Sequence, residues 1–237
     1  MLITDKNPQI VIAAASEDEF TEKVNRDDGA GITTMTKFDD LYFGIKTLDT
    51  SWSSYSRTHI WQPEKVVDIL DDGKFIIGMM KFEKLWTIYH AKNTGITSQE
   101  IAVFDNVPDL KDHIAQQWKK GMDITDLYND NGNYYIVTSS GLNWKQSYLI
   151  DPYPENEIHE IGRSGSFITE VMPLDDKDNL WIFSGNTGYN YMAVGFLSTK
   201  NIDDIQKGIK TEEGYGDGYR ATLIRDVLHK LFIVLLK

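Results

Sequence analysis

The sequence predicts an all-β fold, namely a five-bladed β-propeller or a closely related closed ring of repeats of about 47 residues. A short pattern (glycine, two variable residues, an apolar residue and usually threonine) occurs five times. Its copies begin at Gly29, Gly73, Gly121, Gly165 and Gly218. The intervals between these glycines are 44, 48, 44 and 53 residues, and joining the two chain ends adds a fifth interval of 48. Such a constant period is typical of repeat architectures.

Each repeat is expected to contain three strands and one short helix. The glycine pattern opens the first strand. A second apolar run, rich in aromatic and β-branched residues that favour strands, follows thirteen residues after the glycine in four repeats and sixteen residues after Gly165. These second runs begin at Tyr42, Trp86, Tyr134, Trp181 and Leu231.

A polar turn and a third apolar stretch come next, followed by a short segment with helical spacing of its apolar residues. Three of the third stretches begin with glutamine, at Gln9, Gln99 and Gln146. Three of the helical segments are preceded by proline, at Pro63, Pro108 and Pro154. Proline suits the first turn of a helix, so these residues mark the predicted helix starts.

The N-terminus enters this cycle at the third strand, and the C-terminus leaves it after the second strand. We therefore expect one blade to be shared between residues 218–237 and 1–28, which would leave no open sheet edge. A single domain, residues 1–237, would then hold this blade and the repeats 29–72, 73–120, 121–164 and 165–217. The alternative is a chance pattern in a chain with two unrelated halves.

Composition bears on the class of partner. The net charge is −12, and Lys119-Lys120 is the densest basic pair, so neither nucleic acid nor an anionic membrane is an expected partner. A basic protein would be attracted to this surface, although the charge could serve solubility alone. The longest apolar run is too short to span a bilayer and the N-terminus lacks a basic signal-peptide start, so we expect a cytoplasmic protein.

Neither catalytic residues nor a metal or cofactor site is predicted. The histidines do not share a metal-ligand spacing, and His113 and His159 are expected on the repeat surface. Asn131-Gly132 lies between two apolar runs and predicts a hairpin turn rather than a calcium loop. Acids near the repeat core leave a propeller glycoside hydrolase as an alternative, because two suitably spaced carboxylates suffice for that chemistry. They are Asp123, Asp126 and Glu170.

The connections between the second and third strands carry the candidate binding residues. In a closed ring these connections would lie on one rim, and large aromatic residues at loop tips commonly serve recognition. The candidates are Trp52, Asn93, Trp144, Asn186 and Tyr189. We predict a non-enzymatic binding module that presents these loops to a macromolecular partner; a carbohydrate-binding lectin is the alternative. The aromatic residues could instead fold back onto the neighbouring repeat.

Two resemblances follow from this layout. Residues 118–168 resemble the repeated domain at the C-terminal end of plant casein-kinase-I-like kinases and in some bacterial proteins. The matching residues are Trp118, Gly121, Ile124, Thr125, Gln146, Pro154, Ile158, Gly165 and Ile168. Unit length and number are also similar to those of five-bladed tachylectin-type propellers, which bind a sugar at each blade. That resemblance implies a glycan partner, although the diverging loops here do not favour five equivalent sites.

Overall fold

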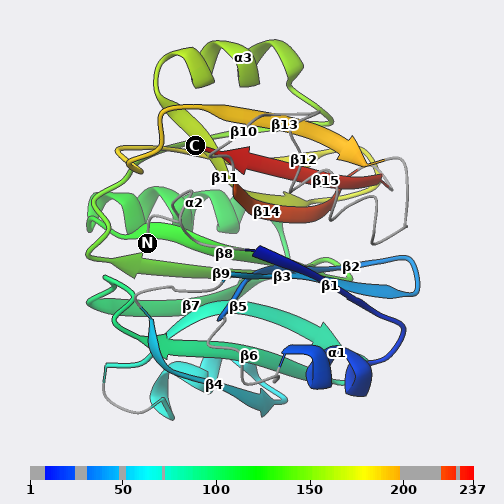
Figure 1. Cartoon of the computed structure of the whole chain (residues 1–237). Coiled ribbons are helices and arrows are strands. Elements are labelled where there is room, and N and C mark those ends of the chain that lie inside the picture. Colours follow the sequence, from blue (N-terminus) through cyan, green and yellow to red (C-terminus); the bar gives the residue numbers. More distant parts are fainter. Residues whose placement is uncertain (1–8, 25–30, 48–51, 71–72, 198–219, 228–229) are drawn as a thin grey trace. The chain divides into compact units, whose positions relative to one another are not determined.

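The computed structural model describes residues 9–24, 31–47, 52–70, 73–197, 220–227 and 230–237 (Figure 1). The chain divides into two compact units. The central unit comprises residues Ser51–Thr187. The terminal unit comprises Leu2–Thr50 and Gly188–Lys237.

The described residues form five three-stranded antiparallel sheets, which confirms the all-β prediction. The sheets of the central unit are β4-β6-β5, β7-β9-β8 and β10-β12-β11. Their strands are β4 (Ser53–Ile60), β5 (Phe75–Phe82), β6 (Leu85–Lys92), β7 (Ser98–Phe104), β8 (Asp123–Asp130), β9 (Asn133–Ser140), β10 (Lys145–Asp151), β11 (Ser166–Pro173) and β12 (Asn179–Gly185). The terminal unit holds the sheets β1-β3-β2 and β13-β15-β14. Their strands are β1 (Gln9–Ala14), β2 (Gly31–Phe38), β3 (Leu41–Thr47), β13 (Met192–Leu197), β14 (Arg220–Val227) and β15 (Lys230–Leu236).

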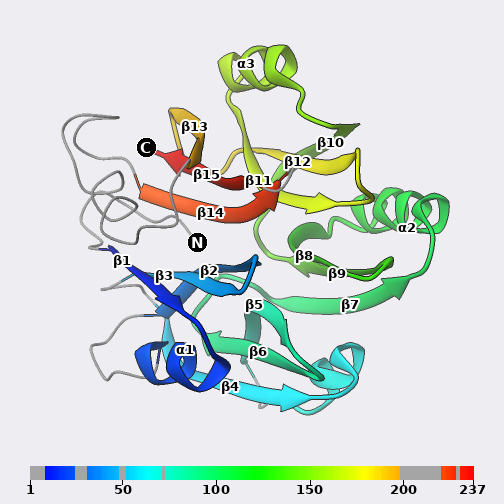
Figure 2. The ribbon, with the colours of Figure 1, turned by 90° about the vertical axis from the view of Figure 1, so that its right-hand side faces the viewer.

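Short helices begin where proline or a capping residue predicts them. A 3-10 helix, η1 (Pro63–Asp68), starts at its proline, and α3 (Glu155–Arg163) follows Pro154 directly. In α2 (Val107–Lys119) the side chain of Asn106 accepts the backbone N–H of Asp109, which caps the first turn. Helix α2 lies beside β7 and β8 (Figure 2), and α3 contacts β11. These three helices therefore lie against the sheets of the central unit.

The order of strands within a sheet differs from the predicted grouping. In each sheet the chain makes one edge strand, then the other edge strand, and finally the middle strand, as in β10-β12-β11. The two edge strands are parallel to each other, since both are antiparallel to β12. Parallel strands require a long crossover, and the helical segment supplies it within one sheet. The third strand of each predicted repeat therefore belongs to the sheet of the next repeat.

The predicted shared blade is consequently wrong. The N-terminal strand β1 pairs with β3, and the C-terminal strand β15 is the middle strand between β13 and β14. Within the terminal unit the two sheets are neighbours, because β2 and β14 lie side by side. The two ends of the chain thus meet through adjacent sheets and not through one sheet.

The repeated glycine pattern marks a β-bulge at the start of an edge strand. In all five sheets the register shifts at the residue four positions after the glycine. The bulged residues are Thr33, Ile77, Thr125, Thr169 and Thr222. Gly73, Gly121 and Gly165 have φ between +75° and +84°, which explains the glycine, whereas Gly29 and Gly218 lie outside the described residues.

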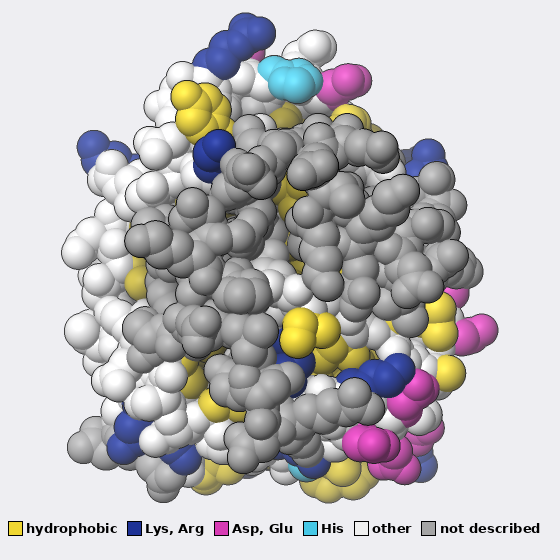
Figure 3. All heavy atoms as spheres, viewed as in Figure 1, with side chains coloured by type: hydrophobic (Ala, Val, Ile, Leu, Met, Phe, Trp, Pro, Cys, Tyr) yellow, Lys and Arg dark blue, Asp and Glu magenta, His cyan; other side chains and the backbone are white. Residues whose placement is uncertain are grey.

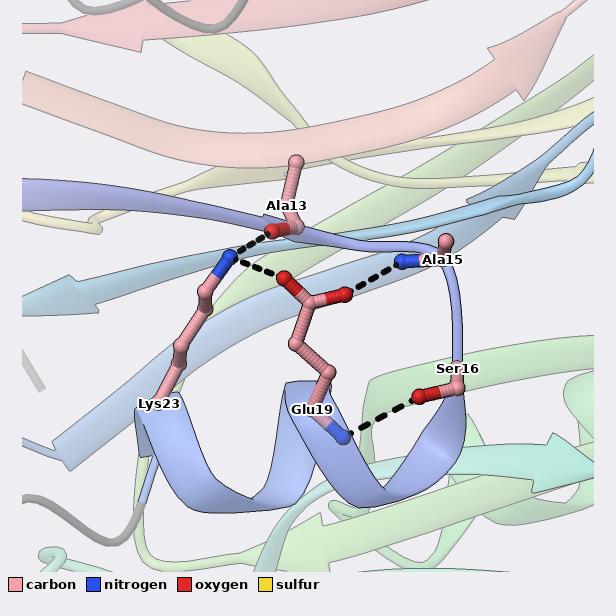
Figure 4. Close-up of polar contacts among 5 residues, drawn as sticks. All are labelled: Ala13, Ala15, Ser16, Glu19 and Lys23. Atoms are coloured by element: carbon pink, nitrogen blue, oxygen red, sulfur yellow. Dashed lines mark hydrogen bonds and ion pairs between the residues drawn. The ribbon is translucent and has the colours of Figure 1, made fainter.

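Helix α1 (Glu17–Val24) is fastened to the end of β1 by a small polar network (Figure 4). The Ser16 hydroxyl accepts the backbone N–H of Glu19, and the Glu19 carboxylate accepts the N–H of Ala15. Lys23 donates to Glu19 and to the carbonyl of Ala13, both at 2.7 Å. The hydrogen bond from Lys23 and that from Ala15 lower the pKa of Glu19. This network fixes the direction in which the chain leaves β1.

Candidate functional site

The candidate residues lie on connections from the middle strand of one sheet to the first edge strand of the next. In the central unit two such connections, residues 93–97 and 141–144, are in contact. The Thr97 N–H donates to the carbonyl of Ser140 at 3.0 Å, and the two hydroxyls are 2.8 Å apart. The Ser98 hydroxyl is 2.6 Å from the same Ser140 hydroxyl. These bonds hold the two loops in one arrangement.

Close backbone packing completes the contact between the loops. Gly141 has a φ of +101°, and a Cβ atom at this position would lie 2.5 Å from the carbonyl oxygen of Gly95. Only glycine fits both the conformation and the space. The sequence therefore builds a rigid junction between the two loops at Gly141.

Trp144 is partly buried at the end of the second loop, where β10 begins. Its backbone N–H donates to Oδ2 of Asp123 at 3.1 Å. Burial raises the pKa of Asp123, and the hydrogen bond from Trp144 opposes that rise. The preceding Asn143 is exposed and adopts a φ of +58°. Asp123 thus sets the position at which Trp144 and Asn143 meet solvent.

The first loop is joined to the start of β4 on its other side. Asn93 is exposed, has a φ of +60°, and donates from its side-chain amide to the Ser53 hydroxyl at 2.9 Å. Trp52 precedes Ser53 and is partly buried, and its indole N–H is buried without a hydrogen-bond partner. The three sheets of the central unit therefore present these segments at the same end.

A glutamine after each loop fastens it to the preceding sheet. The side-chain amide of Gln99 accepts the N–H of Ile76 at 2.7 Å and donates to the carbonyl of Ile76 at 3.0 Å. The same amide donates to the hydroxyl of Ser139 in its own sheet. Because Gln99 is only 7% exposed, these bonds replace water on a buried bulge. We call this pair of hydrogen bonds, one accepted and one donated by the glutamine amide, the glutamine clamp.

The glutamine clamp recurs in both units. Gln146 accepts the N–H of Ile124 at 2.7 Å and donates to its carbonyl at 2.9 Å. In the terminal unit Gln9 makes the same pair of bonds with Ala221, each at 2.8 Å. The sequence showed the recurrence of these glutamines. Their role appears only when the bulged strand of the adjacent sheet is in place.

The structure brings part of the predicted site together. Asn93 and Asn186 are exposed, whereas Trp52, Trp144 and Tyr189 are partly buried, so the aromatic residues are not freely exposed tips. Tyr189 belongs to the terminal unit and is not assigned to the same site. We define the loop surface by the contiguous uncharged residues of the central unit. It consists of Ser53, Asn93, Gly95, Thr97, Ser98, Ser140, Gly141, Asn143 and Trp144.

Two exposed aromatic residues were not predicted. Among the described residues, Trp61 is 68% exposed at the end of β4, and Tyr191 is 61% exposed. Tyr191 lies two residues after Tyr189 in the same connection, and its backbone exchanges hydrogen bonds with Lys237. The sequence Tyr189-Asn190-Tyr191 holds a second tyrosine in the same connection, and that was the signal by which Tyr191 could have been found. No comparable signal marked Trp61.

Asp126, one of the acids considered for a glycoside hydrolase, is held by backbone hydrogen bonds. Both carboxylate oxygens of Asp126 accept backbone N–H groups, from Met79 at 2.8 Å and from Leu127 at 2.9 Å. No set of three or more His, Asp or Glu side chains within the described chain is placed to hold a metal ion. No described helix is long and apolar enough to cross a membrane. On the face shown in Figure 3, Lys and Arg side chains of the described residues are scattered rather than gathered in a large basic patch.

These features define a repeat protein of five three-stranded sheets, with a polar loop surface on its central unit. The chain belongs to the family described as Domain of unknown function (DUF7477), which matches residues 49–235. No curated protein and no solved structure is significantly similar to the chain. The resemblances to the kinase-associated repeat and to tachylectin-type propellers stay predictions.

Proposed function

We propose that this protein is a non-enzymatic binding module, and that the loop surface of the central unit contacts a macromolecular partner. One observation carries the proposal: two loops from different sheets are locked together by Thr97, Ser140 and Gly141. Ordering a flexible loop on binding costs free energy, so a loop held in advance binds more tightly. Exposed amides and hydroxyls next to the half-buried Trp144 supply the polar and aromatic contacts typical of binding surfaces.

A basic protein is the partner that the charge favours. The net charge of −12 attracts a positively charged molecule and speeds its approach. The loop surface was defined by its uncharged residues, and Lys92 and Lys145 adjoin it in the chain, so the long-range attraction would come from the rest of the protein and the contact itself from short-range polar bonds. Association should then slow as the salt concentration rises, while the dissociation rate changes little.

A lectin is the second candidate, and the chemistry of the loop surface favours it. Asn93, Asn143, Thr97 and Ser98 are exposed and uncharged, and they offer both donors and acceptors to sugar hydroxyls. Trp144 supplies an aromatic ring beside them. A glycan array tests this candidate directly, since binding should disappear when Trp144 is replaced by alanine. The glycosidase alternative is less well supported, because Asp123 and Asp126 already accept backbone N–H groups.

A five-bladed propeller is the arrangement of sheets that we propose for this function. In the central unit β8 neighbours both β5 and β11, and in the terminal unit β2 neighbours β14. Edge strands in side-by-side contact are expected around the axis of a propeller. An experimental structure in which β2 also contacts β5, and β11 also contacts β14, would support a closed ring. Two separated units would contradict it.

Paired glycine substitutions test the binding proposal without straining the backbone. Asn93 and Asn143 have positive φ, so Asn93→Gly and Asn143→Gly delete an exposed amide and keep the local conformation. Asn131→Gly is the matched control, because Asn131 also has a positive φ and lies at the opposite, hairpin end of the sheet. Partners captured from the source cell should be lost by the double variant and kept by the control. Equal capture by all three proteins would contradict the proposal.

A further inference from the structure

The two ends of the central unit differ in charge. In each of its sheets the two edge strands start where the middle strand ends, so the loop surface and these strand starts share one end of the unit. Helices α2 and α3 also return to this end, because β8 and β11 follow them. Charged residues within one position of these strand and helix ends are mostly basic. They are Lys74, Lys92, Lys119, Lys120, Asp123, Lys145 and Arg163.

The acids of the central unit gather mainly at its other end. At the loop end Asp123 is only 4% exposed. The stretch that leads from η1 to β5 adds the exposed Asp68, together with Asp71 and Asp72, which lie outside the described residues. The opposite end holds the hairpin turns and the helix starts. Its charged residues are Glu64, Lys81, Glu83, Lys84, Asp105, Asp130, Asp151, Glu155, Asp175, Asp176, Lys177 and Asp178. The loop surface therefore lies at the more basic end of the central unit, although the chain as a whole is acidic.

Five basic side chains at the loop end make neither an ion pair nor a hydrogen bond with another described residue. They are Lys92, Lys119, Lys120, Lys145 and Arg163. All except the partly buried Lys92 are exposed. Lys81, at the other end, is by contrast paired with Asp130. A cation at a helix C-terminus stabilises the helix, which explains in part the three at the ends of α2 and α3. Lys92 and Lys145 lie on strands, so that reason does not apply to them.

Lys92 and Lys145 flank the loop surface on two different sheets. Lys92 ends β6 and is followed by Asn93, and Lys145 begins β10 directly after Trp144. Interactions between exposed charges are largely screened beyond about 8–10 Å at physiological salt. The acids of the hairpin end lie much farther away, because an eight-residue strand such as β6 spans about 25 Å. A molecule seated on the loop surface therefore meets the lysines and is screened from most of the acids.

We propose that the part of the partner that contacts the loop surface is an acidic peptide segment, rich in Asp and Glu. The inference rests on the proposed function, and it reverses the sign of the contact that the net charge alone favours, because nearby charges decide the contact. Lys92 and Lys145 would pair with the carboxylates of the segment. The exposed amides of Asn93 and Asn143 offer donors and acceptors to its backbone. A nucleic acid fits less well, since the net charge of −12 repels a dense row of phosphates.

Titration of the full chain into fluorescein-labelled octaglutamate, followed by fluorescence anisotropy, tests the inference. Octaglutamate should bind at low salt, and its affinity should fall as NaCl is added. The double variant Lys92→Glu with Lys145→Glu should bind it roughly tenfold more weakly or worse. Lys84→Glu with Lys177→Glu is the matched control, because it changes the net charge equally at two exposed lysines of the hairpin end. This control should bind octaglutamate within about twofold of the wild type.

Several results would overturn the inference. The absence of octaglutamate binding, or an equal loss in the two charge variants, would show that the lysines beside the loop surface form no site. Tighter binding of an octanucleotide or a sulfated octasaccharide than of octaglutamate would assign the surface to another class of ligand. The partner captured from the source cell separates this inference from the proposed function. If capture is lost with Asn93→Gly and Asn143→Gly but persists with Lys92→Glu and Lys145→Glu, the loop surface binds and the acidic segment is wrong.

Discussion

Replacing Gln99 with alanine tests whether the glutamine clamp stabilises the contact between neighbouring sheets. The substitution removes three hydrogen bonds, two to the backbone of Ile76 and one to Ser139. Each such bond contributes about 1 kcal/mol net, so the free energy of unfolding should fall by about 3 kcal/mol. The loss could exceed that sum, because Ile76 is only 2% exposed and its polar backbone groups would stay buried without partners.

Urea unfolding of the full chain, followed by tryptophan fluorescence, measures this loss. Gln116→Ala is the matched control, since Gln116 is exposed on α2 and its removal should change stability by no more than about 0.5 kcal/mol. Gln99→Glu adds a second check, because only a protonated carboxyl can both accept from the N–H and donate to the carbonyl of Ile76. Its deficit relative to wild type should therefore shrink as the pH falls. A loss below about 1 kcal/mol in Gln99→Ala would refute the role of the clamp.

Two further predictions concern the loop surface. Gly141→Ala should destabilise the protein by about 1–3 kcal/mol and disturb both loops, because it combines a strained φ with a clash against Gly95; thermal unfolding and binding measured on the same sample check this. A melting temperature equal to that of wild type would show that the junction is not rigid. Burial raises the folded-state pKa of Asp123 above 3.8, so the contribution of this group is most favourable at low pH and declines as the pH rises through the raised pKa. Asp123→Asn removes that decline, so its stability relative to wild type should increase as the pH rises above 3.8, as denaturation at a series of pH values would reveal. A constant difference across the range would contradict the argument.

The sequence predicted the local elements well because their signals are local. The glycines at positions 73, 121 and 165 mark positive φ at the start of an edge strand, and Asn131-Gly132 forms the expected hairpin. Pro63 and Pro154 stand at helix starts as predicted. Each of these features depends on the conformational limits of one or two residues, which the sequence reveals directly.

Long-range features could not be predicted in the same way. The grouping of strands into sheets depends on which strand the chain pairs with after each crossover. A pattern that repeats at a fixed period looks the same wherever a repeat is taken to begin, so it does not show which three strands form one sheet. The backbone position of Trp144 depends on Asp123, and the loop junction depends on Thr97 and Ser140. Both arise from residues more than twenty positions apart.

The most direct test of the binding proposal is to measure affinity and thermal stability together on Trp144→Ala. The partner captured by the wild-type chain is the ligand, and Trp61→Ala serves as a control at an exposed tryptophan outside the loop surface. If the loop surface binds, Trp144→Ala should lose about 2 kcal/mol or more of affinity while the fold is retained, and Trp61→Ala should bind as wild type does. A clear fall in melting temperature with unchanged affinity per folded molecule would assign Trp144 a structural role and contradict the proposal.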